Sequence, residues 1–157
     1  MRNRILEIVV FLMDFMRQHQ GHQSSGEDLS SALKNMGYSE YEITTAYSWF
    51  LERFDDTPEQ YFSSFPSQHH SNRILTSSER FRISSDAYGF LIKLLNMSLI
   101  NDEQLEFILE RAAIFESEMI ALDQIKLIAS SIVFEDIEDF DSLPFFDTKN
   151  DQSRMVN

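Results

Sequence analysis

The chain has 157 residues, of which 43% are hydrophobic and 14 are phenylalanine, so it is long enough to fold as one domain with a sizeable core. It has no cysteine, which excludes structural disulfides and zinc–thiolate sites. Its formal net charge of -13 repels nucleic acid and anionic membranes and favours basic partners.

Apolar runs in the sequence are too short for a membrane span. The longest one, residues 8–13, has six residues, whereas a transmembrane helix needs about 20. The N-terminal apolar stretch is interrupted at Asp14 and has no small-residue cleavage site after it, so it does not fit a secretory signal. We therefore expect a soluble, cytoplasmic protein that does not associate with membranes.

The first predicted element is a helix from Ile5 to about His19. Apolar residues recur at helical spacing and also fill most positions between, so the helix is apolar nearly all round. Such a helix is usually buried on more than one side. A polar Gly/Ser/Gln connector, 18–26, follows it.

Two helices joined by a tight turn form the central predicted element. Ser24 with Glu27 has the capping-box pattern that would begin the first helix, and Ser39 with Glu42 repeats it for the second. Gly37 lies between them, where a helix ends most easily on a left-handed residue, because glycine has no Cβ to strain that conformation. This spacing is typical of a helix-turn-helix.

The charges of the second helix argue against DNA reading by this pair. The positions expected to face outward early in the helix contain no basic residue, although groove recognition relies on Arg and Lys. We therefore favour a packed structural corner. The expected outward positions are Glu40, Tyr41, Glu42, Thr44, Thr45 and Ser48; the expected apolar faces are Leu29, Ala32, Leu33 and Met36, then Ile43, Ala46, Tyr47, Phe50, Leu51 and Phe54.

A long connector, 55–72, separates the helix pair from the rest of the chain. The stretches 60–62 and 73–76 could pair as a small β-hairpin. Helix, two helices and hairpin follow the order of a winged helix, so we predict a helix-turn-helix or winged-helix-like lobe over residues 1–76.

From Thr76 the sequence is helical again. Thr76 with Glu79 is another capping box, and Asn101 would begin a later helix. We predict a mainly α protein, a bundle of about six helices, in which residues 77–135 form a second lobe that shares a core with the first. Its expected inward residues are Phe90, Leu91, Leu94, Leu95 and Met97 around Gly89, then Leu105, Ile108, Leu109, Ala112 and Phe115, and, in a last helix beginning near Leu122, Ile125, Ile128, Ala129, Ile132 and Val133.

Residues 136–157 form a predicted acidic-aromatic tail. Residues 102–147 hold 13 acidic and 2 basic side chains, and large apolar residues alternate with the acids near the end. This alternation is typical of a segment that docks on a hydrophobic groove with a basic rim; the alternative is that the aromatics cover the protein's own core. The candidate partner-binding residues are Phe140, Leu143, Phe145 and Phe146.

No motif indicates catalysis. There is no Gly-x-Ser-x-Gly elbow, no His-Glu-x-x-His pattern and no glycine-rich phosphate loop. The four histidines, at positions 19, 22, 69 and 70, fall at helix ends or in loops. We therefore predict a protein that is not an enzyme, with no catalytic residue, no metal and no cofactor.

The ordered set of motifs resembles the bacterial Smg family, over about residues 5–135. The resemblance departs at Leu105 and Leu127, where the family pattern has Arg and Trp. It implies a cytoplasmic bacterial protein of a family without an established activity. The matching residues are Leu33, Met36-Gly37-Tyr38, Ile43, Ala46 and Trp49; Arg73-Ile74, Thr76 and Glu79; Gly89-Phe90-Leu91 and Leu94; Glu110-Arg111; and Leu122 to Lys126.

Two hypotheses about function follow. The first is a non-enzymatic protein-interaction or regulatory module that presents an apolar groove, or its acidic-aromatic tail, to a protein partner. A basic partner would complement the acidic charge of the chain. The alternative is a nucleic-acid-associated regulator acting through the helix-turn-helix-like half, with Arg73, Arg80 and Arg82 as the basic group.

Overall fold

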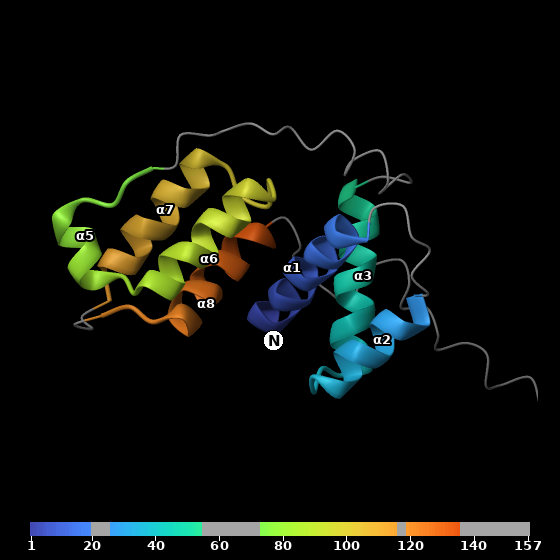
Figure 1. The fold of residues 1–157 in the computed structure, drawn as a ribbon. Helices are drawn as coiled ribbons and strands as arrows, with labels where there is room; N and C mark the ends of the chain where they lie inside the picture. The colour runs from blue at the N-terminus through green and yellow to red at the C-terminus, as the bar shows by residue number, and fades with distance from the viewer. Residues whose placement is uncertain (20–25, 55–72, 116–118, 136–157) are drawn as a thin grey trace, which may run out of the picture. The chain divides into compact units, whose positions relative to one another are not determined.

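The computed structural model describes residues 1–19, 26–54, 73–115 and 119–135. These residues form seven helices and no strand, which confirms a mainly α fold (Figure 1). One isolated parallel β-bridge, between Ile83 and Ile120, is present among them. The helices are α1 (Arg2–Gln18), α2 (Gly26–Asn35), α3 (Glu40–Phe54), α5 (Ser77–Arg82), α6 (Ser85–Asn96), α7 (Asp102–Ala113) and α8 (Leu122–Val133).

The chain divides into two compact units, which we describe separately. The first unit comprises Met1–Leu6 and Pro66–Asp136, and the second comprises Glu7–Phe65 and Ile137–Asn157. The predicted division of the chain into two lobes and a tail stays a prediction, with the lobes at 1–76 and 77–135 and the tail at 136–157.

Helix α1 is buried over much of its circumference, as its sequence predicts. Seven of its apolar side chains are buried, and at 100° per residue they cover roughly 200° of the helix surface. These residues are Ile5, Leu6, Ile8, Val9, Val10, Leu12 and Met13.

In the second unit, α2 and α3 are joined by the predicted glycine turn. Gly37 has φ +89°, so it occupies the left-handed region. The amide of Gly37 donates to the carbonyl of Lys34, and that of Tyr38 donates to Leu33, the two hydrogen bonds of a Schellman motif. The amide of Ser39 donates to the Glu42 carboxylate at 2.9 Å, and the Glu42 amide donates to the Ser39 hydroxyl at 3.2 Å, so the capping box of α3 is confirmed. Ser24 lies outside the described residues.

The outward face predicted for α3 is wrong in part. Glu42, Thr45 and Ser48 are buried, with Thr45 fully inaccessible; Glu42 bonds back to Ser39 and the Thr45 hydroxyl donates to the Tyr41 carbonyl at 2.7 Å, so these two polar side chains are satisfied where they are buried. Leu51, which was predicted to lie on the apolar face, is exposed. Trp49 is buried, as expected of a core residue.

The core of the first unit is built from three helices. Helix α8 packs on both α6 and α7, and α6 packs on α7 (Figure 1). The inward residues predicted for α8 are all buried. Two other predicted core residues are exposed because they lie beyond the ends of their helices: Phe115 follows α7, and Met36 follows α2.

The chain after Thr76 forms two separate helices, α5 and α6, with a break between them at residues 83–84. Helix α5 ends at Arg82 because Ile83 leaves the helix to form the bridge with Ile120, whose amide donates to the Arg82 carbonyl at 2.6 Å. Residues 73–76 are neither helix nor strand, and the other half of the predicted hairpin, 60–62, lies outside the described residues.

Candidate functional site

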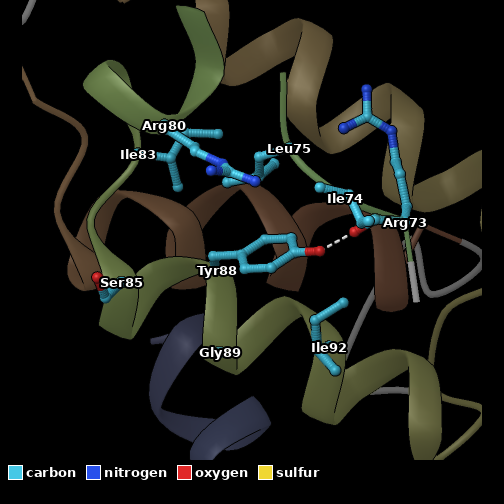
Figure 2. Close-up of a pocket in the computed structure, with 9 residues that line it drawn as sticks. All are labelled: Arg73, Ile74, Leu75, Arg80, Ile83, Ser85, Tyr88, Gly89 and Ile92. Atoms are coloured by element: carbon cyan, nitrogen blue, oxygen red, sulfur yellow. Dashed lines mark hydrogen bonds between the residues drawn. The ribbon is translucent and has the colours of Figure 1, made fainter. Parts of the chain in front are cut away.

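Helix α6 has two faces with different roles. Its inner face, Ala87, Leu91, Leu94 and Leu95, is buried in the core of the first unit. Its outer face, with spacing i, i+3, i+4 and i+7, forms one side of an open groove with a cavity volume of about 570 Å³ (Figure 2). The groove is lined on α6 by Ser85, Tyr88, Gly89 and Ile92, and around it by Arg73, Ile74, Leu75, Arg80 and Ile83.

Local sequence features hold the elements that surround the groove. Thr76 caps α5 in a complete capping box with Glu79, and Ser84 caps α6 by accepting a hydrogen bond from the Ala87 amide. Between the caps, Ile83 is held by its bridge to Ile120. The short helix α5 is therefore fixed at both ends, and Arg80 is presented from it.

Arg73 is tied to carboxylates on two helices. Its guanidinium donates two hydrogen bonds of 2.9 Å to Glu79 and also forms an ion pair with Glu106. The bond from Arg73 lowers the pKa of Glu79 to about 2, and the same contact raises the pKa of Arg73 above its ordinary value. Figure 2 shows the guanidinium of Arg73 pointing away from the groove.

Other polar groups around the groove are also bonded within the protein. The Tyr88 hydroxyl donates to the backbone carbonyl of Arg73, the dashed line in Figure 2. Arg82 donates to the carbonyls of Ala113 and Phe115, at 3.0 and 2.8 Å, and so secures the end of α7. These groups stabilise the fold whether or not a ligand is bound.

Arg80 differs from the two other arginines of this region, Arg73 and Arg82. It is exposed, and its guanidinium makes no hydrogen bond or ion pair with any described residue. Figure 2 shows its side chain reaching over the groove toward Leu75. Of the three predicted nucleic-acid-contacting residues, Arg73, Arg80 and Arg82, the structure therefore leaves one guanidinium available among the described residues.

The lining of the groove is suited to binding. Among the described residues that line it there is no histidine and no carboxylate, so none of these residues is a general base for Ser85 or Tyr88. Within the described residues, no group of three or more His, Cys, Asp or Glu side chains could hold a metal. The arrangement offers an apolar floor and a cation, both of which can bind a ligand.

A second, smaller cavity of about 230 Å³ lies on the α7 side of α5 and shares Ile83 with the groove. Its charge is opposite: Glu79, Glu106 and Glu110 line it, with Arg82. Glu79 and Arg82 are bonded within the protein as described above.

Several sequence-predicted features lie outside the described residues. These include the predicted partner-binding residues of the tail and three of the four histidines; the fourth, His19, forms a 2.8 Å hydrogen bond with the Phe15 carbonyl. Conversely, the groove residues Tyr88 and Ile92 were not predicted. Two signals in the sequence could have indicated these groove residues. They lie at helical spacing from Ser85, on the face opposite the apolar stripe, and Gly89 lies on the same face. No helix in the described parts of the chain has the length and apolar character that crossing a membrane requires.

A family model described as "Protein of unknown function (DUF494)" matches residues 5–148. Similar proteins include Protein Smg of Buchnera aphidicola subsp. Schizaphis graminum, 27% identical over 134 residues, which are 83% of this chain and 84% of that protein. The Smg homologue of Halorhodospira halophila is 23% identical over 134 residues, 85% and 84% of the two chains. That of Idiomarina loihiensis is 30% identical over 112 residues, 69% of each chain. No solved structure matches this chain.

Proposed function

This chain belongs to the Smg family of proteins of unknown function, as its motifs predict, and we propose that it acts in the cytoplasm as a non-enzymatic module that binds a protein partner. The observation that carries the proposal is the groove beside α6. It combines an apolar floor with an arginine, Arg80, whose guanidinium has no partner among the described residues, and the side chains of Arg73 and Tyr88 are already bonded within the protein.

The groove can supply useful binding energy. A buried aliphatic or aromatic side chain contributes about 1.5–3 kcal/mol through the hydrophobic effect, and Leu75, Ile83 and Ile92 provide the apolar surface. Ile74 extends this surface at the rim, where it is 75% exposed. A large exposed apolar side chain next to a groove is typical of a binding site, whereas an isolated one is common on any protein.

The acidic-aromatic tail is a second proposed docking element. Phe140, Leu143, Phe145 and Phe146 would enter an apolar surface of a partner, and the surrounding acids would favour a basic one. The tail and the groove would then contact partner surfaces of opposite charge.

The alternative, a nucleic-acid-associated regulator with a helix-turn-helix or winged-helix-like half, has less support. Phosphate contacts need several free cations, but Arg73 and Arg82 are engaged within the first unit. In the second unit, Lys34 lies 4.0 Å from Glu40, at the beginning of α3, so that end of the helix carries acidic charge as well.

Site-specific photocrosslinking in the bacterium that encodes the protein tests the proposed function. The full-length chain would carry p-benzoylphenylalanine in place of Ile74 or, as the control, in place of Leu127, a 58% exposed apolar residue of the same unit outside the groove. We expect a protein adduct from position 74 and none from position 127, both read by mass spectrometry.

The tail is tested in the same cells. Full-length protein with alanine at positions 140, 143, 145 and 146 should lose partners that depend on the tail and keep the adduct at position 74. Absence of any protein adduct at position 74, together with an unchanged set of partners in the tail variant, would contradict both docking elements and the proposed function with them.

A further inference from the structure

The charged residues described in the lining of the groove are opposite in sign to the net charge of the chain. The protein carries a net charge of -13, yet the described residues that line the groove include two arginines and no carboxylate. Arg73 is paired with Glu79 and Glu106, so Arg80 is the lining arginine without a carboxylate partner in the described part of the chain. An occupant that complements this site presents one anionic group to Arg80 and an apolar group to the floor.

The non-helical backbone at the rim indicates what kind of molecule brings these groups. Residues 73–76 lie outside any helix, and Ile74 and Leu75 make no hydrogen bond with any other described residue. Backbone N–H and C=O groups in such a segment can pair with an added peptide strand, a common mode of peptide recognition. A peptide that runs along this segment can place alternate side chains toward the groove.

Gly89 keeps the floor of the groove open. A Cβ built at Gly89 meets no atom within 4 Å, so packing does not require glycine there. Glycine inside a helix costs about 0.5–1 kcal/mol relative to alanine. Because Gly89 lies on the face that lines the groove, between Tyr88 and Ile92, a side chain at this position would occupy groove volume (Figure 2). The physical effect of glycine at 89 is therefore on the space available to an occupant.

From these three features we infer that the groove binds an extended acidic peptide segment of a partner protein, and this inference rests on the proposed interaction function. The segment pairs its backbone with Ile74 and Leu75, places one Phe, Leu or Ile side chain over Gly89 between Ile83 and Ile92, and sets an Asp or Glu carboxylate against Arg80. Arg80 is the residue that selects acidic over basic segments.

Selection from a library of random peptides tests this occupant, because every sequence can compete for the groove. Phage-displayed random peptides would be selected on the immobilised full-length protein, and the enriched peptides made with a fluorescein label for affinity measurement by fluorescence polarisation. We expect enriched peptides to contain Asp or Glu within about three residues of a large apolar residue.

Three variants then assign the contacts. Arg80→Glu should weaken binding of the enriched peptides at least about tenfold, because it removes the cation and repels the carboxylate. The control Arg111→Glu changes an exposed arginine of the same unit that lies over the Phe107 ring, 4.8 Å from its centroid and away from the groove, and should change affinity by less than about twofold. Gly89→Ala should weaken binding by about fivefold, since the added methyl reduces the floor volume.

The outcomes separate this inference from the proposed function on which it rests. Enriched peptides that are apolar or basic, weakened by Gly89→Ala but not by Arg80→Glu, would overturn the acidic occupant and leave the groove as a docking site. Failure to enrich any peptide, together with no adduct at position 74, would overturn both. Retention of a fluorescein-labelled DNA duplex at low salt that depends on Arg80, without acidic peptides, would assign the free arginine to nucleic acid instead.

Discussion

The turn between α2 and α3 and the groove beside α6 both contain a glycine and a capping box, and they use these features differently. In the turn, Gly37 has a positive φ, and its neighbours complete the Schellman hydrogen bonds, so its chemistry serves the fold. At the groove, Gly89 is helical, and a Cβ added there would meet no atom within 4 Å, so packing does not require glycine. The guanidinium of Arg80 likewise has no partner in the described part of the chain. Residues that local stability does not require are the better candidates for binding.

The largest expected effect is the loss of stability when a core residue of the second unit is removed. Trp49 on α3 is buried, with 5% of its surface exposed, and its ring meets that of Phe54 edge-on at a centroid distance of 6.4 Å. Trp49→Ala should lower the free energy of unfolding by about 3–5 kcal/mol because it leaves a large cavity. Urea denaturation followed by circular dichroism measures this change. A loss below about 1 kcal/mol would mean that the ring contributes little to the core.

Glu79 belongs to the frame of the groove, and its removal should have the next largest effect. Glu79→Gln keeps a side chain that can reach back to the Thr76 amide but loses the charged bond with Arg73, so it should cost about 1–2 kcal/mol. Arg111→Gln, at an exposed position without a carboxylate partner in the described residues, serves as the control.

The same variant gives a pH dependence with a defined sign. The pKa of Glu79 is lowered from 4.5 to about 2 in the folded protein, so its contribution to stability is present above pH 4.5 and is lost as the pH falls toward 2. The difference in unfolding free energy between the native chain and Glu79→Gln should therefore shrink over this range. A difference that stays constant down to pH 2 would show that the ion pair does not stabilise the fold.

Gly37→Ala tests the conformational requirement in the turn. No atom lies within 4 Å of a Cβ added at Gly37, so the expected cost of about 1 kcal/mol comes from the positive φ alone. Gly37→Asn is the matched control, because asparagine tolerates the left-handed conformation better and should cost less. Thermal unfolding of both variants measures the order; equal melting temperatures for the native chain and Gly37→Ala would contradict it.

The smallest effects are expected at the groove, and one has the opposite sign. Gly89→Ala should raise the free energy of unfolding by about 0.5–1 kcal/mol, because alanine favours the helix and meets no obstacle. Arg80→Ala should change it by less than about 0.5 kcal/mol, since the guanidinium has no partner in the described residues. A clear loss of stability in either variant would remove the contrast between the groove and the turn.

Much of the fold was predictable because its signals are local. The capping boxes at Ser39 and Thr76, the helix cap at Asn101 and the turn at Gly37 involve residues within a few positions of each other, and each is present as predicted. The burial of α8 also followed from its spacing. Helix ends were less predictable: Met36 and Phe115 fit an apolar period, but the helices end before them. The candidate site was predictable only in part, since Arg73, Arg80 and Arg82 are equivalent as charges in the sequence.

The sequence by itself determined the helical class, the caps, the glycine turn and the family, because these depend on short-range spacing and on residue identity. The tertiary structure decided which arginine has no partner among the described residues, since Glu106 and the carbonyls of Ala113 and Phe115 come from more than 30 residues away to bond Arg73 and Arg82. It also decided that α5 ends before Ile83, because the partner of that residue in the β-bridge, Ile120, is brought to it only when the first unit is folded.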